Sequence, residues 1–335
     1  MKFHFEFDIK KLAWPISHSH KLFLIGSCFT ENIGEKLKRN KFRVLENPHG
    51  ILFNPISVSE AIVDYIDKKQ YAANDLFELN EGWHSWKHHS RFSGITVSEA
   101  IEKINSSINF THDFIKKSDY VMITLGSAWV YTLSELAINA LPGTVAANNH
   151  KAPANWFNKK LLTTEEVLSA LDNVMHRLFH FSPGIKIIFT ISPVRHLREG
   201  VVENNRSKAV LIQAVHHLVN KFEGLYYFPA YELVIDDLRD YRFYAEDMVH
   251  PNYAATEYVW EKFQQACMED STRKLMEEIN SINLAFKHRP FNPSSGSHKK
   301  FLQASLEKTI RLKEQFPELD FKEEIEKFQN GLKTE

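Results

Sequence analysis

The sequence predicts an α/β domain with a mostly parallel sheet, and two observations support this fold class. Three short apolar runs, at 22–25, 121–125 and 185–191, each stop at Gly, Ser or Pro, which is typical of buried strands. Their near-continuous apolarity favours strands that are covered on both faces. Segments with helical spacing follow the runs, and this strand–helix alternation indicates a doubly wound sheet with helices on either side.

The elements follow in chain order. The first strand ends at Gly26 and leads into a helix through Ile33 and Leu37, and a possible second strand spans 42–45. The clearest helix begins at Thr163, because Glu166 lies three residues later and completes a capping box. This helix leads into the strand at 185–191. A further helix follows a polar loop, with a predicted inner face of Ala209, Ile212, Val215 and Leu218.

A compositional break divides the chain near its C-terminus. Residues 289–297 are rich in Pro, Ser and Asn, as linkers are. The charge-rich tail beyond carries an imperfect helical stripe formed by Leu302, Leu306, Ile310 and Leu312. We therefore predict a domain over 1–288 and a linker with a helical tail over 289–335. The apolar stripe is also compatible with a homodimer.

The composition and net charge limit the classes of partner that the chain is expected to bind. The chain has 335 residues, of which 43% are hydrophobic and 25% charged, close to a soluble globular average. Its 41 Lys and Arg nearly balance 42 Asp and Glu, for a net charge of −1. This balance gives no general attraction to nucleic acid or to an anionic membrane, so the expected partner is a small molecule bound at a local site.

The two cysteines, Cys28 and Cys267, form no paired motif, so we expect neither a disulfide framework nor a thiolate metal site. No secretory signal pattern is seen at the N-terminus, and no apolar stretch approaches about 18 residues. A cytoplasmic location is the expectation. Glycine-rich nucleotide-binding motifs are absent, so no cofactor is expected.

Two short motifs carry candidate chemistry. Ser27 stands where the first strand ends and a helix begins, so its hydroxyl could be a nucleophile beside the positive end of that helix, or the turn could simply cap the helix. Far downstream, Asp247 and His250 are three residues apart. On a helical turn this spacing lets the carboxylate hold one imidazole nitrogen while the other takes a proton, although a local surface pair has the same pattern.

Five motifs in order make the sequence similar to a known family. The segment Gly26-Ser27-Cys28-Phe29-Thr30 resembles the motif that names the GSCFA family, within the SGNH or GDSL-like hydrolase superfamily, with Thr30 in place of the final Ala. Four further segments resemble that family, at 47–55, 125–131, 192–196 and 242–251. The resemblance covers roughly residues 20–265.

The resemblance implies a three-layer α/β/α, flavodoxin-like fold and a serine hydrolase that needs no metal. By this resemblance Ser27 is the nucleophile, His250 the general base and Asp247 the residue that orients it. The reaction is cleavage of an O-acyl ester, possibly on a carbohydrate or glycoconjugate, through an acyl-enzyme. Transfer of the acyl group to an alcohol uses the same residues.

The sequence departs from the superfamily's pattern at the residues expected to bind the oxyanion. The resemblance implies three donors: the Ser27 N–H, a Gly for which Gly50 is the positional candidate, and an Asn that follows the third strand. Ala128 stands in place of that Asn, and Asn54 is the first candidate to replace it. Losing one such donor typically costs about 2.7–4 kcal/mol of transition-state stabilisation. A non-catalytic ligand-binding protein on the same fold is therefore the alternative.

Other residues have competing interpretations. Cys28 could itself be the nucleophile, since a thiol at a helix N-terminus can have a lowered pKa, or it could be a small buried residue. The aromatic and basic segment 83–92, with His84, His88 and His89, is interpreted as a pocket wall or an ordinary loop and not as a metal site. The predicted substrate-binding residues are Trp129, Arg195, His196 and His89. Arg195 could also order the Asp247–His250 loop or form a structural salt bridge.

Overall fold

A computed structural model describes residues 5–333. Its central sheet has five parallel strands in the spatial order β10-β9-β5-β1-β2. The strand bounds are β1 (Lys21–Gly26), β2 (Arg43–Glu46), β5 (Tyr120–Leu125), β9 (Lys186–Ile191) and β10 (Leu225–Tyr227). Counted along the chain, these five strands have the order 2-1-3-4-5 of the flavodoxin-like fold. The predicted fold class is confirmed.

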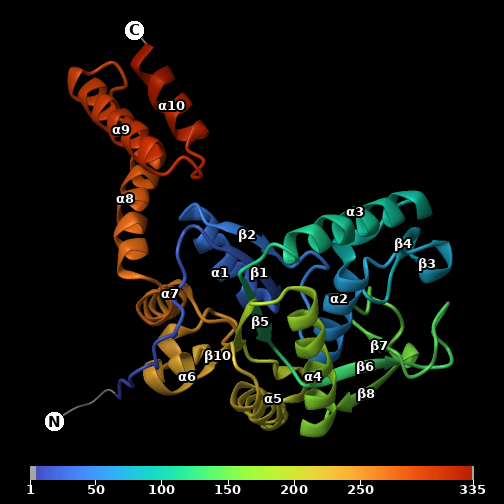
Figure 1. Ribbon diagram of the computed structural model, residues 1–335. Helices are drawn as coiled ribbons and strands as arrows, with labels where there is room; N and C mark the ends of the chain where they lie inside the picture. Colours follow the sequence, from blue (N-terminus) through green and yellow to red (C-terminus); the bar gives the residue numbers. More distant parts are fainter. Residues whose placement is uncertain (1–4, 334–335) are drawn as a thin grey trace.

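Helices cover both faces of this sheet (Figure 1). The bounds of the longer helices are α1 (Cys28–Arg39), α2 (Pro55–Asp67), α3 (Val97–Ile115), α4 (Thr164–Phe181), α5 (Val201–Lys221) and α7 (Tyr253–Cys267). Phe23 and Ile25 of β1 face a core cluster that α2, α3, α4 and α5 complete. Leu22 and Leu24 point to the opposite face, against α1 and α7. This alternation of side chains produces the three layers.

The helix boundaries agree with the sequence signals, with one correction. Thr163 and Glu166 form the predicted capping box at the start of α4. The predicted inner face of α5 is wrong by one residue at its start: Ala209 is exposed, whereas Lys208 is buried and lies in phase with the buried residues Leu211 and Val215. An inner face that begins with a lysine is unusual, and it places a charge inside the domain.

Several small elements lie outside the predicted pattern. A three-stranded antiparallel sheet joins β7 (Val145–Ala146), β6 (Trp129–Leu133) and β8 (Phe157–Leu161), and a hairpin joins β3 (Phe77–Leu79) to β4 (Gly82–His84). These strands are short, and most of their side chains are only partly buried. Short half-exposed strands lack the apolar run by which the buried strands were predicted. Between β10 and α7 lies a short helix, α6 (Ala230–Glu232), which continues in a π-helical turn over 233–238.

The C-terminal helices form an assembly of their own, α8 (Asp270–Lys287), α9 (Gly296–Gln315) and α10 (Lys322–Lys333), which stands away from the α/β body (Figure 1). The stripe residues Leu302, Leu306 and Leu312 are buried in its apolar cluster, together with residues of α8 and α10. Most of the stripe is therefore covered by this chain itself. The predicted boundary at 288 stays a prediction, and α8 packs with the tail.

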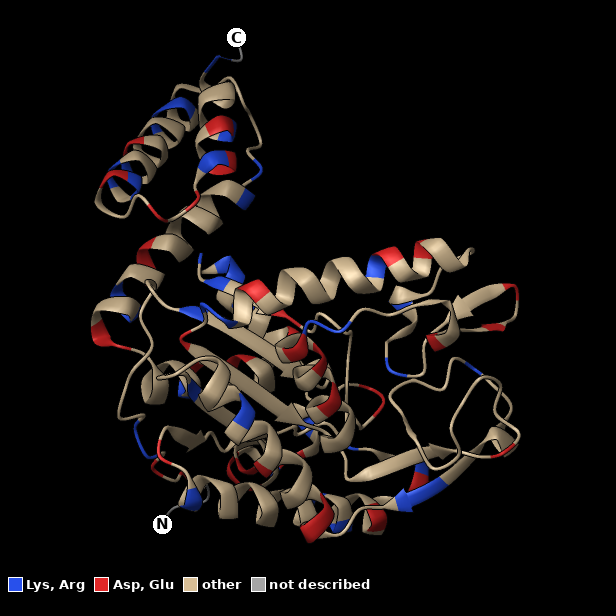
Figure 2. Cartoon of the chain, turned by 45° about the vertical axis from the view of Figure 1, so that its right-hand side comes forward, with Lys and Arg blue, Asp and Glu red and all other residues tan. Residues whose placement is uncertain are grey.

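Two polar contacts join these helices to α1 and its following turn. Lys41 Nζ pairs with Glu324 Oε1 at 2.6 Å, and Asn283 Nδ2 donates to the Arg39 carbonyl at 2.8 Å. Positive and negative residues are interspersed over the body and the tail (Figure 2). Within residues 5–333, no helix has the length and apolar character that a membrane span requires.

Candidate active site

The turn between β1 and α1 lies at the carboxyl edge of the sheet, where the strand order reverses between β1 and β5. Ligands bind at this switch point in open α/β sheets. Gly26 pairs with Thr124 of β5, and its φ is +142°. A Cβ at this position would lie 2.1 Å from the Thr124 carbonyl oxygen, so only glycine lets the two strand ends approach.

The two side chains after Gly26 have different environments. Ser27 is fully buried, its Oγ has no hydrogen-bond partner, and its hydroxyl does not cap α1. Cys28 is the first residue of α1 and is partly exposed. Burial raises the pKa of the Cys28 thiol, which outweighs the opposing effects of nearby N–H groups and of Lys208. The lowered pKa considered for a thiol at this helix end is therefore not found.

Asp247 and His250 form the pair that their spacing predicts. Asp247 Oδ2 lies 2.7 Å from His250 Nδ1, and Asp247 Oδ1 accepts the N–H groups of Val249 at 2.9 Å and His250 at 3.0 Å. These donors hold the pKa of Asp247 at about 2. Both side chains are about half exposed. An ionised carboxylate thus fixes the imidazole ring and leaves Nε2 to exchange a proton.

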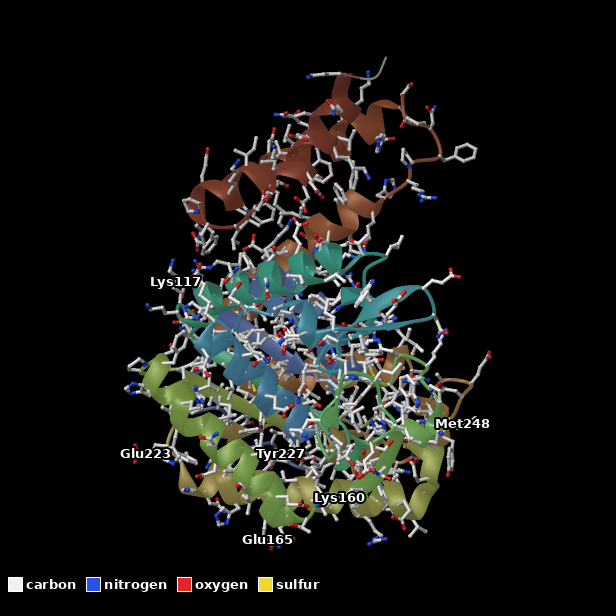
Figure 3. All side chains as sticks on the ribbon, turned by 90° about the vertical axis from the view of Figure 1, so that its right-hand side faces the viewer. Lys117, Lys160, Glu165, Glu223, Tyr227 and Met248 are labelled. Carbon is white, nitrogen blue, oxygen red and sulfur yellow. The ribbon has the colours of Figure 1, made fainter. Side chains whose placement is uncertain are left out.

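Arg195, just beyond the end of β9, attaches this loop to the sheet edge. Its N–H donates to the Val249 carbonyl at 3.1 Å, and its Nη1 donates to the Met248 carbonyl at 3.3 Å. The guanidinium also lies 4.1 Å from the ring centre of Tyr244. Met248 lies at the periphery of the body (Figure 3) with a left-handed φ of 58°. These contacts are those of a residue that orders the Asp247–His250 loop, whereas substrate binding by Arg195 stays a prediction.

Replacing Arg195 by Ala is expected to lower the kcat of any His250-dependent reaction by about 10- to 100-fold, since small misplacements of a catalytic group have effects of this size. The backbone bond to Val249 remains, so the thermal midpoint should hardly change. Steady-state kinetics and thermal unfolding of the same samples check both expectations. Arg195→Lys keeps the charge but not the planar contact with Tyr244. A full recovery in Arg195→Lys would show that charge alone matters.

The predicted link between Ser27 and His250 is not formed in this structure, because Ser27 Oγ has no hydrogen-bond partner. In unliganded enzymes such bonds are often long and form only with substrate. The roles of Ser27, Asp247 and His250 stay predictions.

The three predicted oxyanion donors already have protein partners. The N–H of Ser27 donates to the Thr124 carbonyl at 3.1 Å, and the N–H of Gly50 donates to the Asn47 carbonyl at 2.7 Å. Asn54 is the N-cap of α2: its Oδ1 accepts the Ser57 N–H at 2.8 Å, and its Nδ2 donates to Ser57 Oγ at 3.0 Å. The N–H groups of Ser27 and Gly50 would have to exchange a bond to serve a substrate, whereas the Asn54 amide has a second N–H.

Two substitutions at Asn54 separate its capping bond from the predicted oxyanion bond. Asn54→Ala is expected to lower the free energy of unfolding by about 1 kcal/mol, the usual effect of losing an N-cap. Asn54→Asp keeps a capping oxygen and should restore that stability, but it removes the amide donor. Since one N–H of that amide is held by Ser57 Oγ, in the cap of α2, we take capping to be the main role of Asn54 and expect Asn54→Asp to keep most of the activity. A loss of about 100-fold or more would instead identify Asn54 as an oxyanion donor.

Lys208 is a functional candidate that no sequence motif marks. Its side chain is 1% exposed, and its Nζ donates to the carbonyls of Gly126 at 2.6 Å and Ser192 at 2.7 Å, at the ends of β5 and β9. Burial lowers the pKa of Lys208 to about 7, against the raising effect of Cys28. The signal that could have found it is a lysine in phase with the apolar face of α5.

His196 also lies close to Gly126. A Cβ built on Gly126 would be 3.1 Å from His196 Nε2, and this buried nitrogen has no hydrogen-bond partner. The ring packs edge-on against Phe53. Burial lowers the pKa of His196 to about 4, with further lowering by the charges of Lys208 and His250. His196 Nε2 therefore lies beside Gly126, directly after the end of β5.

The remaining predicted binding residues have structural contacts. Trp129 Nε1 donates to the Glu203 carbonyl at 3.4 Å, and Lys159 Nζ lies 4.4 Å from the ring centre of Trp129. His89 Nδ1 accepts the Arg91 N–H at 3.3 Å. A Cβ on Gly50 would lie 2.1 Å from the His89 Cβ, so His89 packs directly on Gly50. Substrate binding by Trp129, His196 and His89 stays a prediction.

His84 and His88 of segment 83–92 make contacts within the protein. His88 is buried, stacks on His49 at 4.0 Å between ring centres, and contacts Ser85 Oγ at 3.0 Å. His84 Nδ1 contacts Ser93 Oγ at 2.7 Å. Within the described range, no three His, Cys, Asp or Glu side chains are arranged to hold a metal ion.

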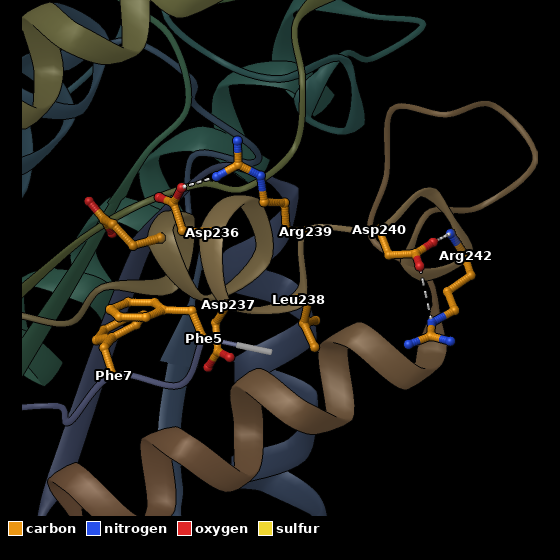
Figure 4. A pocket seen from close by; sticks show the side chains of 9 residues that line it. Phe5, Phe7, Asp236, Asp237, Leu238, Arg239, Asp240 and Arg242 are labelled. Carbon is orange, nitrogen blue, oxygen red and sulfur yellow. Dashed lines mark hydrogen bonds and ion pairs between the residues drawn. The ribbon is translucent and has the colours of Figure 1, made fainter. Parts of the chain in front are cut away.

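A cavity of about 910 Å³ lies elsewhere, between the N-terminal segment and the turns after β10 (Figure 4). Phe5 and Phe7 line one side of it, and ion pairs join Asp236 to Arg239 and Asp240 to Arg242. None of the predicted site residues lines this cavity. We therefore place the candidate site at the sheet edge.

No curated protein matches the chain. Among solved structures, it is similar to a carbohydrate esterase family 3 from Talaromyces cellulolyticus, with 7% identity, a TM-score of 0.35, and coverage of 78% of this chain and 99% of that one. It is also similar to an acetyl xylan esterase from the rumen bacterium Butyrivibrio proteoclasticus, with 10% identity, a TM-score of 0.35, and coverage of 80% and 65%. A similarity this weak does not assign the activity of those proteins to this chain. The GSCFA family model matches residues 21–263 and the model of the GSCFA domain protein, C-terminal domain, matches 279–334, so the chain belongs to the GSCFA family.

Proposed function

We propose that the chain is an esterase-type hydrolase that cleaves an O-acyl ester at the sheet edge between β1 and β5. The observation that carries this proposal is the Asp247–His250 pair, in which the carboxylate fixes Nδ1 at 2.7 Å and leaves Nε2 as the base. Arg195 joins the pair to the end of β9. The β1–α1 turn supplies a nucleophile, for which Ser27 and Cys28 are the candidates.

The reaction follows from these groups. His250 takes the proton of the nucleophile, which attacks the ester carbonyl. The proton then goes to the leaving alcohol, and water cleaves the acyl-enzyme with the same base. We propose a carbohydrate or glycoconjugate as the carrier of the acyl group, and an alcohol could replace water as the final acceptor. Because Cys28 and Cys267 are free, we propose a reducing compartment, the cytoplasm, as its location.

The test is hydrolysis of p-nitrophenyl acetate by the purified full-length chain. We expect His250→Ala to lower kcat/KM by about 1000-fold or more, as loss of a catalytic base does. His217→Ala, which changes an exposed histidine on α5, is the matched control and should be unaffected. Wild-type turnover no faster than the buffer would favour the ligand-binding alternative. That alternative is supported by the hydrogen bonds that the predicted oxyanion donors already make to other groups of the protein. It is also supported by Ala128, which stands in place of the superfamily's Asn.

A further inference from the structure

We propose that α5 positions the base of the reaction through a buried polar face formed by Asn204, Ser207 and Lys208. Asn204 is the positioning residue of this face for His250, because it holds the turn after β9 and that turn holds the Asp247–His250 loop. This inference rests on the proposed function, to which it adds residues that act on the base through other residues.

The polar face lies at the start of the buried side of α5. Asn204, Ser207 and Lys208 are spaced i, i+3 and i+4, so they lie on one face of the helix, and they are only 4%, 2% and 1% exposed. The same side of α5 continues with apolar residues of the core, namely Leu211, Ala214, Val215 and Leu218. Because burying polar groups is costly unless they form hydrogen bonds, three of them at the end of an apolar face indicate specific partners beside the helix.

The turn that follows β5 is the first partner. Ser207 Oγ accepts the Ala128 N–H at 2.7 Å and lies 3.3 Å from Ser127 Oγ. Lys208 Nζ donates to the Gly126 carbonyl at 2.6 Å. Since β5 pairs with β1, this turn borders the candidate site, and all three of its residues, 126–128, are bound to α5.

The turn that follows β9 is the second partner. Lys208 Nζ also donates to the Ser192 carbonyl at 2.7 Å, so one ammonium joins the two strand ends. Asn204 Oδ1 accepts the His196 N–H at 2.9 Å. The His196 ring packs edge-on against Phe53, whose carbonyl accepts the N–H groups of the first two residues of the other turn at 2.8 and 3.0 Å. The two turns are therefore held to α5 and, through Phe53, to each other.

A continuous set of contacts leads from Asn204 to His250. The residue before His196 is Arg195, whose N–H donates to the Val249 carbonyl at 3.1 Å, and Val249 directly precedes His250. The His250 side chain is 51% exposed, so packing alone does not fix it, and its place depends on the hydrogen bonds that hold its loop. Since a small displacement of a catalytic group strongly lowers the rate, Asn204 acts on the reaction through Arg195 and this loop.

The first experiment measures hydrolysis of p-nitrophenyl acetate by the full-length wild type, Asn204→Ala and Asn204→Asp. We expect Asn204→Ala to lower kcat by about 10- to 100-fold, the effect of a misplaced catalytic group, with little change in KM. Asn204→Asp keeps an oxygen that accepts the His196 N–H and should recover most of this loss. Equal losses in the two variants would show that this hydrogen bond is not the link, and would overturn the inference.

Asn105→Ala is the matched control for a loss of stability. Asn105 of α3 holds the backbone of Tyr71 through its own side chain, at 2.8 Å to the Tyr71 N–H and 2.9 Å to the Tyr71 carbonyl. Both alanine variants should have a lower thermal midpoint, since each removes side-chain bonds to the backbone. A purely structural role of Asn204 predicts a normal kcat for the folded molecules of both variants, whereas positioning of the base predicts a lower kcat in Asn204→Ala alone.

The second experiment needs no turnover. Amide hydrogen exchange is followed by mass spectrometry in peptides that cover 246–252 and, for comparison, β5. The N–H groups of Val249 and His250 are bound to Asp247, and a looser loop in Asn204→Ala should speed their exchange by about tenfold, the effect of losing roughly one hydrogen bond. The exchange of β5 should stay unchanged.

The two experiments together separate this inference from the proposed function. If the kcat of Asn204→Ala is normal, or the exchange of 246–252 is unchanged in that variant, the inference fails and the proposed function stands. If the wild type hydrolyses no ester but Asn204→Ala still speeds the exchange of 246–252, the proposed function fails alone.

Discussion

Asp247→Asn is expected to lower kcat/KM for an ester probe by about 10³- to 10⁴-fold, the effect seen when an asparagine replaces the carboxylate of a catalytic triad. Asp247 binds His250 Nδ1 at 2.7 Å and fixes the ring with the proton on that nitrogen. An asparagine amide can present its own N–H groups, which favours the opposite tautomer and removes the base from Nε2. The measurement is steady-state hydrolysis of p-nitrophenyl acetate near neutral pH.

A matched control for Asp247 is available in the same segment. Asp240 also accepts a local N–H, from Arg242 at 2.9 Å, but it holds no histidine. The Asp240→Asn variant should therefore keep the activity of the wild type.

The ionisation of Asp247 should not limit the activity near neutral pH. Since the pKa of Asp247 is about 2, its carboxylate is ionised at any pH above about 3, and a fall in activity at higher pH must have another cause. Activity of Asp247→Asn within tenfold of wild type would show that the carboxylate does not orient the base.

The sequence predicts the part of this fold that strong local patterns encode. Continuous apolar runs identified β1, β5 and β9, and the capping box at Thr163 placed the start of α4. The Asp247–His250 bond follows from spacing alone, because residues three apart in a turn are neighbours.

The features that were not predicted depend on contacts between distant segments. Whether Gly50 and Asn54 have free donors depends on competing partners, and these were found only in the structure. The burial of Lys208 depends on the rotation of α5 about its axis, which a one-residue shift of the apolar face changes. Likewise, α8 joins the C-terminal helices through packing that the linker composition at 289–297 does not reveal.

The pH dependence of stability should reveal the buried charge of Lys208. Burial lowers the folded pKa of Lys208 from its ordinary 10.5 to about 7. Between these values the unfolded chain binds the proton more strongly, so the free energy of unfolding rises as the pH increases from about 7 to 10.5. Below pH 7 both states are protonated and the full penalty of burying the charge applies, a few kcal/mol at most.

Lys208→Met removes this titration and also the two hydrogen bonds to the carbonyls of Gly126 and Ser192. Leaving a buried carbonyl without its donor typically costs about 1–3 kcal/mol of stability. At pH 7 the substitution has two opposing effects on stability. Losing the donors destabilises the folded state, whereas removing the buried charge stabilises it. We therefore expect Lys208→Met to approach or exceed wild-type stability at pH 7 and to be less stable at pH 9.5. Urea unfolding at both pH values measures the difference, and a Cys28→Ser background removes the titration of the neighbouring thiol. A difference between wild type and Lys208→Met that does not change with pH would show that Lys208 is charged throughout this range, with an anionic partner in the folded protein.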